Sequence, residues 1–145
     1  MIVFIVVDYE QHLTQMIESG QYGKINSDIT AERFPLTGEG VAEFETRMFH
    51  FDHAISPENA IAAIERELWE PAKIEHLLAF GAADKDEQRK FPIFALGSCG
   101  QVAEDRCITC VYGDASIRIL GLHFWGGDYN RRCRFLAIRK LSSGV

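Results

Sequence analysis

The last third of the chain is cut into short β-compatible segments, and this division limits the fold more than any other feature of the sequence. Glycine-containing stretches separate four such segments, which are residues 91–96, 107–112, 117–124 and 134–139. Runs of this length between turn residues are typical of antiparallel strands, because parallel neighbours need long crossover connections. Gly113-Asp114 is a tight-turn signal between two of them. We therefore predict an antiparallel β-meander of about four strands in the C-terminal third.

The start of the chain has the pattern of a strand followed by a helix. Residues 2–7 are apolar at every position, which predicts a central strand covered on both faces. Asp8 is the expected N-cap of the helix, with Gln11 as its capping-box partner, and Gly20 is the expected end. Residues 41–52 have β-compatible composition and predict a further strand.

A helical pair is expected in the middle of the chain. Ser56-Pro57-Glu58 combines an N-cap hydroxyl, a proline at the first helical position and an acid in the first turn. Pro71 interrupts the helical pattern, and a second short helix is expected to end at Gly81.

Length and composition agree with one α+β domain over residues 1–145. The chain is 47% hydrophobic and 25% charged, as in an average globular domain, which excludes the collagen-like, coiled-coil and disordered classes. The order of a strand–helix opening, a helical pair and a meander indicates the α+β class. Residues 84–90 are nearly all charged and mark the expected sub-boundary within the domain.

The charge distribution argues against a dedicated nucleic-acid-binding protein. The formal net charge is −6, the wrong sign for a phosphate-binding surface. The charge is uneven, because residues 1–90 carry 17 acidic and 8 basic side chains whereas residues 91–145 carry 4 and 7. The basic tail could bind anions, or it could attract the acidic part of the same molecule. Single-stranded nucleic-acid binding by this tail stays an alternative.

The protein is expected in the cytoplasm. The apolar run at residues 2–7 is too short for a signal-peptide core, and no segment approaches the ~20 apolar residues of a membrane span. In a reducing compartment the four cysteines would be free thiols, metal ligands or redox groups rather than structural bridges.

Three segments carry a family resemblance: residues 71–80 (PAKIEHLLAF), 91–98 (FPIFALGS) and 133–140 (CRFLAIRK). Together they resemble a recurrent ending of small uncharacterised bacterial proteins. The proline-led helix and the β-rich tail are also similar to C-type-lectin-like domains of the formylglycine-generating-enzyme kind. The resemblance implies a C-terminal fold with a loop-rich binding surface. Calcium sites and paired catalytic cysteines are not carried over, because only four acids lie beyond residue 90.

The predicted ligand-binding site is the glycine-rich turn between the last two expected strands. Aromatic rings, guanidinium groups and polar side chains are concentrated there at His123, Trp125, Asp128, Tyr129, Asn130, Arg131 and Arg132. Arginine presents planar donors to carboxylates and phosphates, while tryptophan and tyrosine stack on ligand surfaces. We expect this turn to recognise a protein or a small anionic ligand. The alternative is that Trp125 and Tyr129 only cover the end of the core.

The four cysteines suggest a zinc-stabilised module as an alternative. Cys107 and Cys110 form a C-x-x-C pair, and Cys99 and Cys133 complete a set of four possible thiolate ligands. Residues three apart on a strand point to opposite faces, so the favoured interpretation is four separate buried thiols and no cofactor.

A hydrolase is the last alternative. His50 and Asp52 would share one face of a strand, where a carboxylate could orient an imidazole base. No nucleophile can be assigned to the pair, and no Gly-x-Ser-x-Gly motif is present. We therefore expect a non-catalytic binding module with no catalytic residues.

Overall fold

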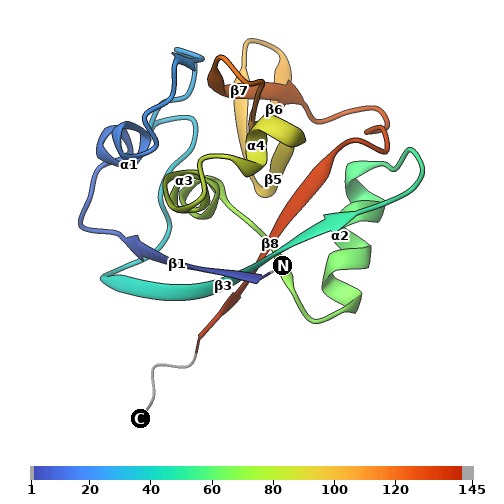
Figure 1. Cartoon of the computed structure of the whole chain (residues 1–145), viewed down its shortest axis with the longest axis horizontal. Helices are drawn as coiled ribbons and strands as arrows, with labels where there is room; N and C mark the ends of the chain where they lie inside the picture. Colours follow the sequence, from blue (N-terminus) through green and yellow to red (C-terminus); the bar gives the residue numbers. More distant parts are fainter. Residues whose placement is uncertain (1, 142–145) are drawn as a thin grey trace.

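Four helices and eight strands make up the fold in the computed structural model, which describes residues 2–141 (Figure 1). In chain order the elements are β1 (Ile2–Asp8), α1 (Leu13–Ser19), β2 (Lys24–Ile25), β3 (Val41–His50), α2 (Pro57–Arg66), β4 (Glu70–Pro71), α3 (Ile74–Ala83), α4 (Glu87–Lys90), β5 (Ile93–Val102), β6 (Asp105–Gly113), β7 (Arg118–Phe124) and β8 (Arg134–Lys140). The strands form one mixed sheet in the order β1-β3-β8-β5-β6-β7-β2, with β4 paired to β8. The α+β class predicted from the sequence is confirmed.

The meander is confirmed for three strands. β5 pairs antiparallel with β6, and β6 pairs antiparallel with β7. The predicted tight turn joins β6 to β7, where Asp114 Oδ1 accepts hydrogen bonds from the backbone N–H groups of Ser116 (2.8 Å) and Ile117 (3.1 Å). An aspartate that binds the backbone of its own turn in this way stabilises the chain reversal.

The fourth predicted strand of the meander is placed differently from the expectation. β8 does not continue beside β7 but lies between β3 and β5, antiparallel to β3 and parallel to β5. The reason is visible in its sequence, because Phe135, Leu136, Ala137 and Ile138 are all buried. Alternate side chains of β8 enter hydrophobic cores on opposite faces of the sheet, so the strand is covered on both faces.

The prediction of a central, doubly covered first strand is wrong. β1 is an edge strand that pairs only with β3. Its side chains alternate, so that Val3, Ile5 and Val7 face the interior while Phe4 and Val6 are 64% and 57% exposed. The uninterrupted apolar run therefore covers the core with one face and presents an apolar face to solvent with the other.

Helix boundaries agree with the sequence at the start of α2 and at the end of α1, where Gly20 is the C-cap, whereas α2 ends at Arg66, before the interruption expected at Pro71. Ser56 Oγ accepts the N–H of Asn59 at the start of α2, as its position predicts. α1 begins later than expected, because His12 and not Asp8 is its N-cap, with Gln15 Oε1 accepting the His12 N–H. α3 continues past Gly81 to Ala83.

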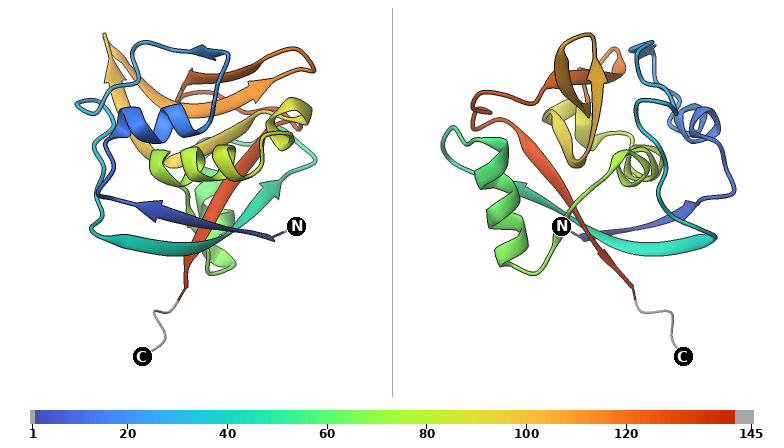
Figure 2. Two further views of the ribbon diagram at one scale, coloured as in Figure 1. Left: turned by 60° about the vertical axis from the view of Figure 1, so that its left-hand side comes forward. Right: turned by 180° about the vertical axis from the view of Figure 1, so that it is seen from behind.

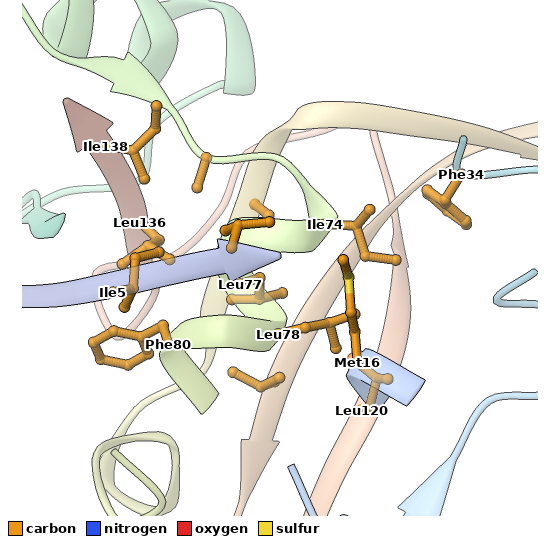
Figure 3. Packing of buried hydrophobic residues seen from close by; sticks show 14 of the residues in the cluster. Ile5, Met16, Phe34, Ile74, Leu77, Leu78, Phe80, Leu120, Leu136 and Ile138 are labelled. Carbon is orange, nitrogen blue, oxygen red and sulfur yellow. The ribbon is translucent and has the colours of Figure 1, made fainter. Parts of the chain in front are cut away.

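Two hydrophobic cores lie on opposite sides of β8. The α3 core includes Leu136 and Ile138 of β8, together with Ile5, Met16, Phe34, Ile74, Leu77, Leu78, Phe80 and Leu120 (Figure 3). The α2 core includes Phe135 and Ala137 of β8, together with Phe49, Ala60, Ile64, Trp69, Phe94, Ile108 and Tyr129. Figure 1 shows β8 between α2 and α3, and the view from behind in Figure 2 agrees.

The charged segment 84–90 is attached to the sheet by a buried residue. Gln88 of α4 donates hydrogen bonds from Nε2 to the carbonyl oxygens of Tyr112 (2.8 Å) and Ile119 (3.3 Å). Its Oε1 accepts a hydrogen bond from the Arg118 guanidinium (2.7 Å).

No helix within residues 2–141 is long and apolar enough to cross a lipid bilayer.

Candidate functional site

A groove of about 350 Å³ runs along the free edge of β1. α1 and α3 lie over the same side of β1 and form its other wall (Figure 2). Most of the lining is apolar, and its main apolar contributors are Phe4, Ile5, Val6, Val7, Met16, Leu78, Ala79, Ala82 and Ala83. The volume and the apolar lining are those of a small-ligand site.

The groove contains a buried carboxylate. Glu75 lies in the first turn of α3 and is 1% exposed. Its Oε2 accepts a hydrogen bond from the Tyr9 hydroxyl (2.8 Å), whereas its Oε1 has no hydrogen-bond partner within residues 2–141. A buried oxygen of a carboxylate is costly to leave without a donor. This atom therefore indicates what a ligand of the groove would supply.

The position of Glu75 follows from the composition of α3. The helix is buried on nearly all sides, and Glu75 and His76 are its two polar residues. A carboxylate in the first turn is favoured by the dipole of the helix. Burial of the phenol raises the pKa of Tyr9, and the hydrogen bond to Glu75 raises it further. Tyr9 is accordingly a hydrogen-bond donor and not a base.

His76 lies beside this pair but is held as a neutral structural residue. Its Nδ1 accepts the backbone N–H of Lys73 (2.9 Å), and its ring packs edge-on against Phe44 with 4.5 Å between ring centres. Burial, reinforced by the Lys73 charge, lowers the pKa of His76 to about 4. At neutral pH the imidazole carries no charge that could pair with a ligand.

The groove is acidic as well as apolar. Asp8 and Glu75 both line it, and no residue that lines it within 2–141 is basic. The matching ligand group is a cation, either an amine or a guanidinium, carried on an apolar or extended body.

The aromatic residues of the predicted turn are used by the fold itself. Tyr129 is 2% exposed, belongs to the α2 core, and donates its hydroxyl to the carbonyl oxygen of Phe124 (2.7 Å). Trp125 Nε1 donates to Glu58 Oε1 (3.0 Å), and the guanidinium of Arg106 stacks 3.9 Å from its ring centre. These contacts match the alternative in which both rings cover the end of the core.

The remaining residues of the turn are exposed, and His123 lines a cavity of about 400 Å³ together with Cys107 and Leu122. His123 packs its ring against Tyr129 and hydrogen-bonds through Nδ1 to the Phe124 carbonyl (2.7 Å). Asp128, Arg131 and Arg132 are exposed. Neither arginine forms an ion pair with another residue of the described part of the chain.

The cysteines do not converge on a metal site. Cys110 and Cys133 are members of the α2 core with Cys99 packed against it, whereas Cys107 belongs to neither core. Within residues 2–141 no three His, Cys, Asp or Glu side chains are arranged to hold a metal ion, and the four thiols are unpaired. Burial, with the nearby Cys133 as a smaller cause, raises the pKa of Cys110 to about 12.

His50 and Asp52 come together only loosely. His50 Nε2 lies 3.9 Å from Asp52 Oδ1 and makes its closer hydrogen bond to the carbonyl oxygen of Arg131 (2.8 Å). The Asp52 side chain is 97% exposed. The carboxylate of the pair is therefore almost completely open to water, while the His50 side chain is 39% exposed.

Glu75 is the functional candidate that the sequence interpretation missed. The signal was available, because residues 74–83 are apolar apart from Glu75 and His76. A helix that is apolar all round is buried, so its carboxylate must be buried as well.

The family resemblances of residues 71–80, 91–98 and 133–140 stay predictions. No family model matches the chain, and no curated protein or solved structure matches it either.

Proposed function

We propose that this protein is a non-catalytic, cytoplasmic binding module whose groove beside β1 takes a ligand that carries an amine or guanidinium group. The observation that carries the proposal is the buried Oε1 of Glu75, which has no donor within residues 2–141. Glu75 belongs to the lining of the groove, most of whose residues are apolar. The cytoplasmic location is a prediction from the sequence alone and stays part of the proposal.

The selectivity would come from charge pairing in a nearly dry site. Glu75 is almost fully enclosed and its Oε1 is buried, so a ligand group in the groove would have to displace neighbouring side chains to reach this oxygen. A hydrogen bond between charged groups contributes about 1.5–3 kcal/mol. A neutral group of the same shape would leave the carboxylate unpaired and would bind more weakly.

Two matched probes test the proposal. We expect n-butylguanidinium to bind in a chemical-shift titration of the ¹⁵N-labelled protein, with the changes centred on residues of β1 and α3. The neutral isostere n-butylurea should bind at least about tenfold more weakly, because it lacks the charge that Glu75 needs.

Substitution of the carboxylate provides the control. Glu75→Gln keeps an acceptor for the Tyr9 hydroxyl but removes the charge, so n-butylguanidinium should lose its advantage over n-butylurea. Glu18→Gln, an exposed position of α1 that does not line the groove, should leave both affinities unchanged. Equal binding of the two probes to the unmodified protein would contradict the proposal.

A second candidate function is the anion binding that the sequence suggests for the turn at residues 123–132. Its support is the exposure of Arg131 and Arg132 without ion-pair partners in the described part of the chain. Inorganic phosphate is the probe, and binding should weaken with added salt and disappear in Arg131→Gln/Arg132→Gln. Binding that survives the double substitution would remove this candidate.

A further inference from the structure

We infer that the natural occupant of the groove is an extended peptide segment of a partner protein, which adds as a strand to the free edge of β1 and places a lysine or arginine side chain on Glu75. The inference rests on the proposed function and names the class of ligand. It draws on two features of β1, its free backbone edge and its exposed apolar face, and on the groove beside it that Glu75 lines.

The free edge of β1 offers backbone hydrogen bonds at two alternate residues, Phe4 and Val6. The Tyr9 N–H donates to the Gly40 carbonyl oxygen (2.8 Å), which sets the register of the β1–β3 ladder. Because backbone groups alternate between the two sides of an antiparallel strand, those of Phe4 and Val6 point away from β3. No other strand within residues 2–141 pairs with this edge.

The exposed face of β1 favours apolar side chains on the added strand. Ile2, Phe4 and Val6 lie side by side on it, and Val41 of β3 is also exposed opposite Asp8. Neighbouring strands place their side chains next to one another on each face of a sheet. An added strand would therefore cover Phe4 and Val6 with every second side chain.

The other side chains of the added strand would point into the groove. There α3 presents Ala79 and Ala82, whose small side chains leave room beside the strand, and Glu75 supplies the unpaired carboxylate oxygen. The partner segment thus alternates apolar residues with a lysine or arginine. Strand addition with pockets for alternate side chains is an established mode of peptide recognition.

The probe is the peptide acetyl-Thr-Val-Lys-Val-Thr-amide, in which the lysine faces opposite to the two valines. We expect its affinity to exceed that of n-butylguanidinium, and replacement of its lysine by glutamine should weaken binding about tenfold. Two N-methylated versions test strand addition, one methylated at the lysine amide and one at both valine amides. Only one of them should lose binding, because alternate amides face β1.

The version that fails also gives the strand direction. In an antiparallel pair the residues opposite Phe4 and Val6 exchange hydrogen bonds with them directly, so methylation of the valines would abolish binding. In a parallel pair the flanking lysine amide forms the bond, and its methylation would abolish binding instead. If both methylated peptides bind like the parent, or if both fail, the inference is overturned.

A protein variant separates this inference from the proposed function. Val6→Pro removes an N–H group that points to the free edge, and edge strands tolerate proline there. Val6 also lines the groove, so the comparison is between the two losses: we expect the peptide to lose at least about tenfold more affinity for this variant than n-butylguanidinium loses. Unchanged peptide binding would refute strand addition but leave the cation site intact.

Analytical ultracentrifugation tests a second occupant of the edge. A concentration-dependent dimer that Val6→Pro abolishes would assign the edge to a second copy of the chain and overturn the inference.

Discussion

Among single residues, His76 links the stability of this protein to pH. The pKa of a histidine is about 6.5 in an unfolded chain, whereas burial lowers that of His76 to about 4. Between these values the unfolded state binds a proton that the folded state excludes, so stability is lost as the pH falls from 6.5 towards 4. We expect a loss of about 2.5 kcal/mol between pH 7.5 and 4.5 from this group.

Urea unfolding of the wild type and of His76→Asn isolates this contribution. Asparagine can still accept the Lys73 N–H but does not titrate. The difference in unfolding free energy between the two proteins should therefore shrink as the pH falls. Two pH profiles that run parallel would show that His76 is not the titrating group.

Arg118 is the other residue with an unusual environment, because a buried guanidinium here has no carboxylate partner. It donates to the carbonyl oxygens of Gly20 and Gly81 (2.8 Å for the latter) and to Gln88 Oε1. Its guanidinium also stacks 4.8 Å from the ring centre of Tyr22. The carbonyl groups at the ends of α1 and α3 carry the negative ends of the helix dipoles, which stabilise the cation.

We expect Arg118→Met to lower the free energy of unfolding by about 3 kcal/mol, because several buried acceptors lose a charged donor at once. Urea unfolding measures the change. Arg132→Met, at an exposed position, is the matched control and should cost less than about 0.5 kcal/mol. A similar cost for both substitutions would mean that the Arg118 hydrogen bonds contribute nothing beyond surface interactions.

At the scale of elements, the junction of β4 and β5 depends on a glycine. The Gly97 N–H donates to the Ala72 carbonyl oxygen (2.7 Å), next to the irregular register of β5 between Ala95 and Cys99. A Cβ atom at Gly97 would lie 2.5 Å from the Pro71 carbonyl oxygen. Because that contact is with backbone, it cannot be relieved by a change of rotamer.

Gly97→Ala should therefore destabilise the protein by about 2 kcal/mol or more. Thermal and urea unfolding give the value. Gly126→Ala is the control, since an added Cβ there meets nothing within 4 Å. If the Gly97 variant is as stable as the Gly126 variant, the β4–β5 contact must be able to move apart.

The elements also show where sequence interpretation succeeds. Local signals located the start of α2 and the β6–β7 turn, because the groups that stabilise them lie within a few residues. The order of strands could not be found locally. The apolar runs of β1 and β8 look alike in sequence, but one is an edge strand and the other is central. That difference depends on which partners the rest of the chain provides.

The same reasoning explains why the sequence and the structure point to different candidate sites. Trp125 and Tyr129 have the composition of a binding loop, but their hydrogen bonds to Glu58 and Phe124 use them for packing. Glu75 becomes a candidate only when α3 is seen to be buried beside a strand that is distant in sequence. A residue type indicates what chemistry is available, and the tertiary contacts decide whether it is free to act.

At the scale of the whole molecule, the topology predicts slow folding in two stages. β5, β6 and β7 pair with their neighbours in sequence, whereas β8 pairs with β3, which lies far upstream. Pairings between distant segments cost more chain entropy and form later. We expect folding to take milliseconds to seconds. Stopped-flow experiments that monitor the fluorescence of Trp69 and Trp125 measure this rate.

A matched pair of substitutions tests the order of events. Ile108→Val in β6 and Ile138→Val in β8 each remove one methyl group from a buried position and should cost about 1 kcal/mol. The first should mainly slow folding, and the second should mainly speed unfolding. The opposite assignment of rates would place β8 in the early structure.

The central position of β8 also matters during synthesis on the ribosome. Until residues 134–140 emerge from the exit tunnel, β3 and β5 each lack a neighbour, and both cores lack one wall. The nascent chain must then wait with two open strand edges and uncovered apolar surface, a condition that promotes misassociation with other chains. Premature termination shortly before this strand would leave a product that cannot close its sheet, and such a product would be a substrate for chaperones and proteases.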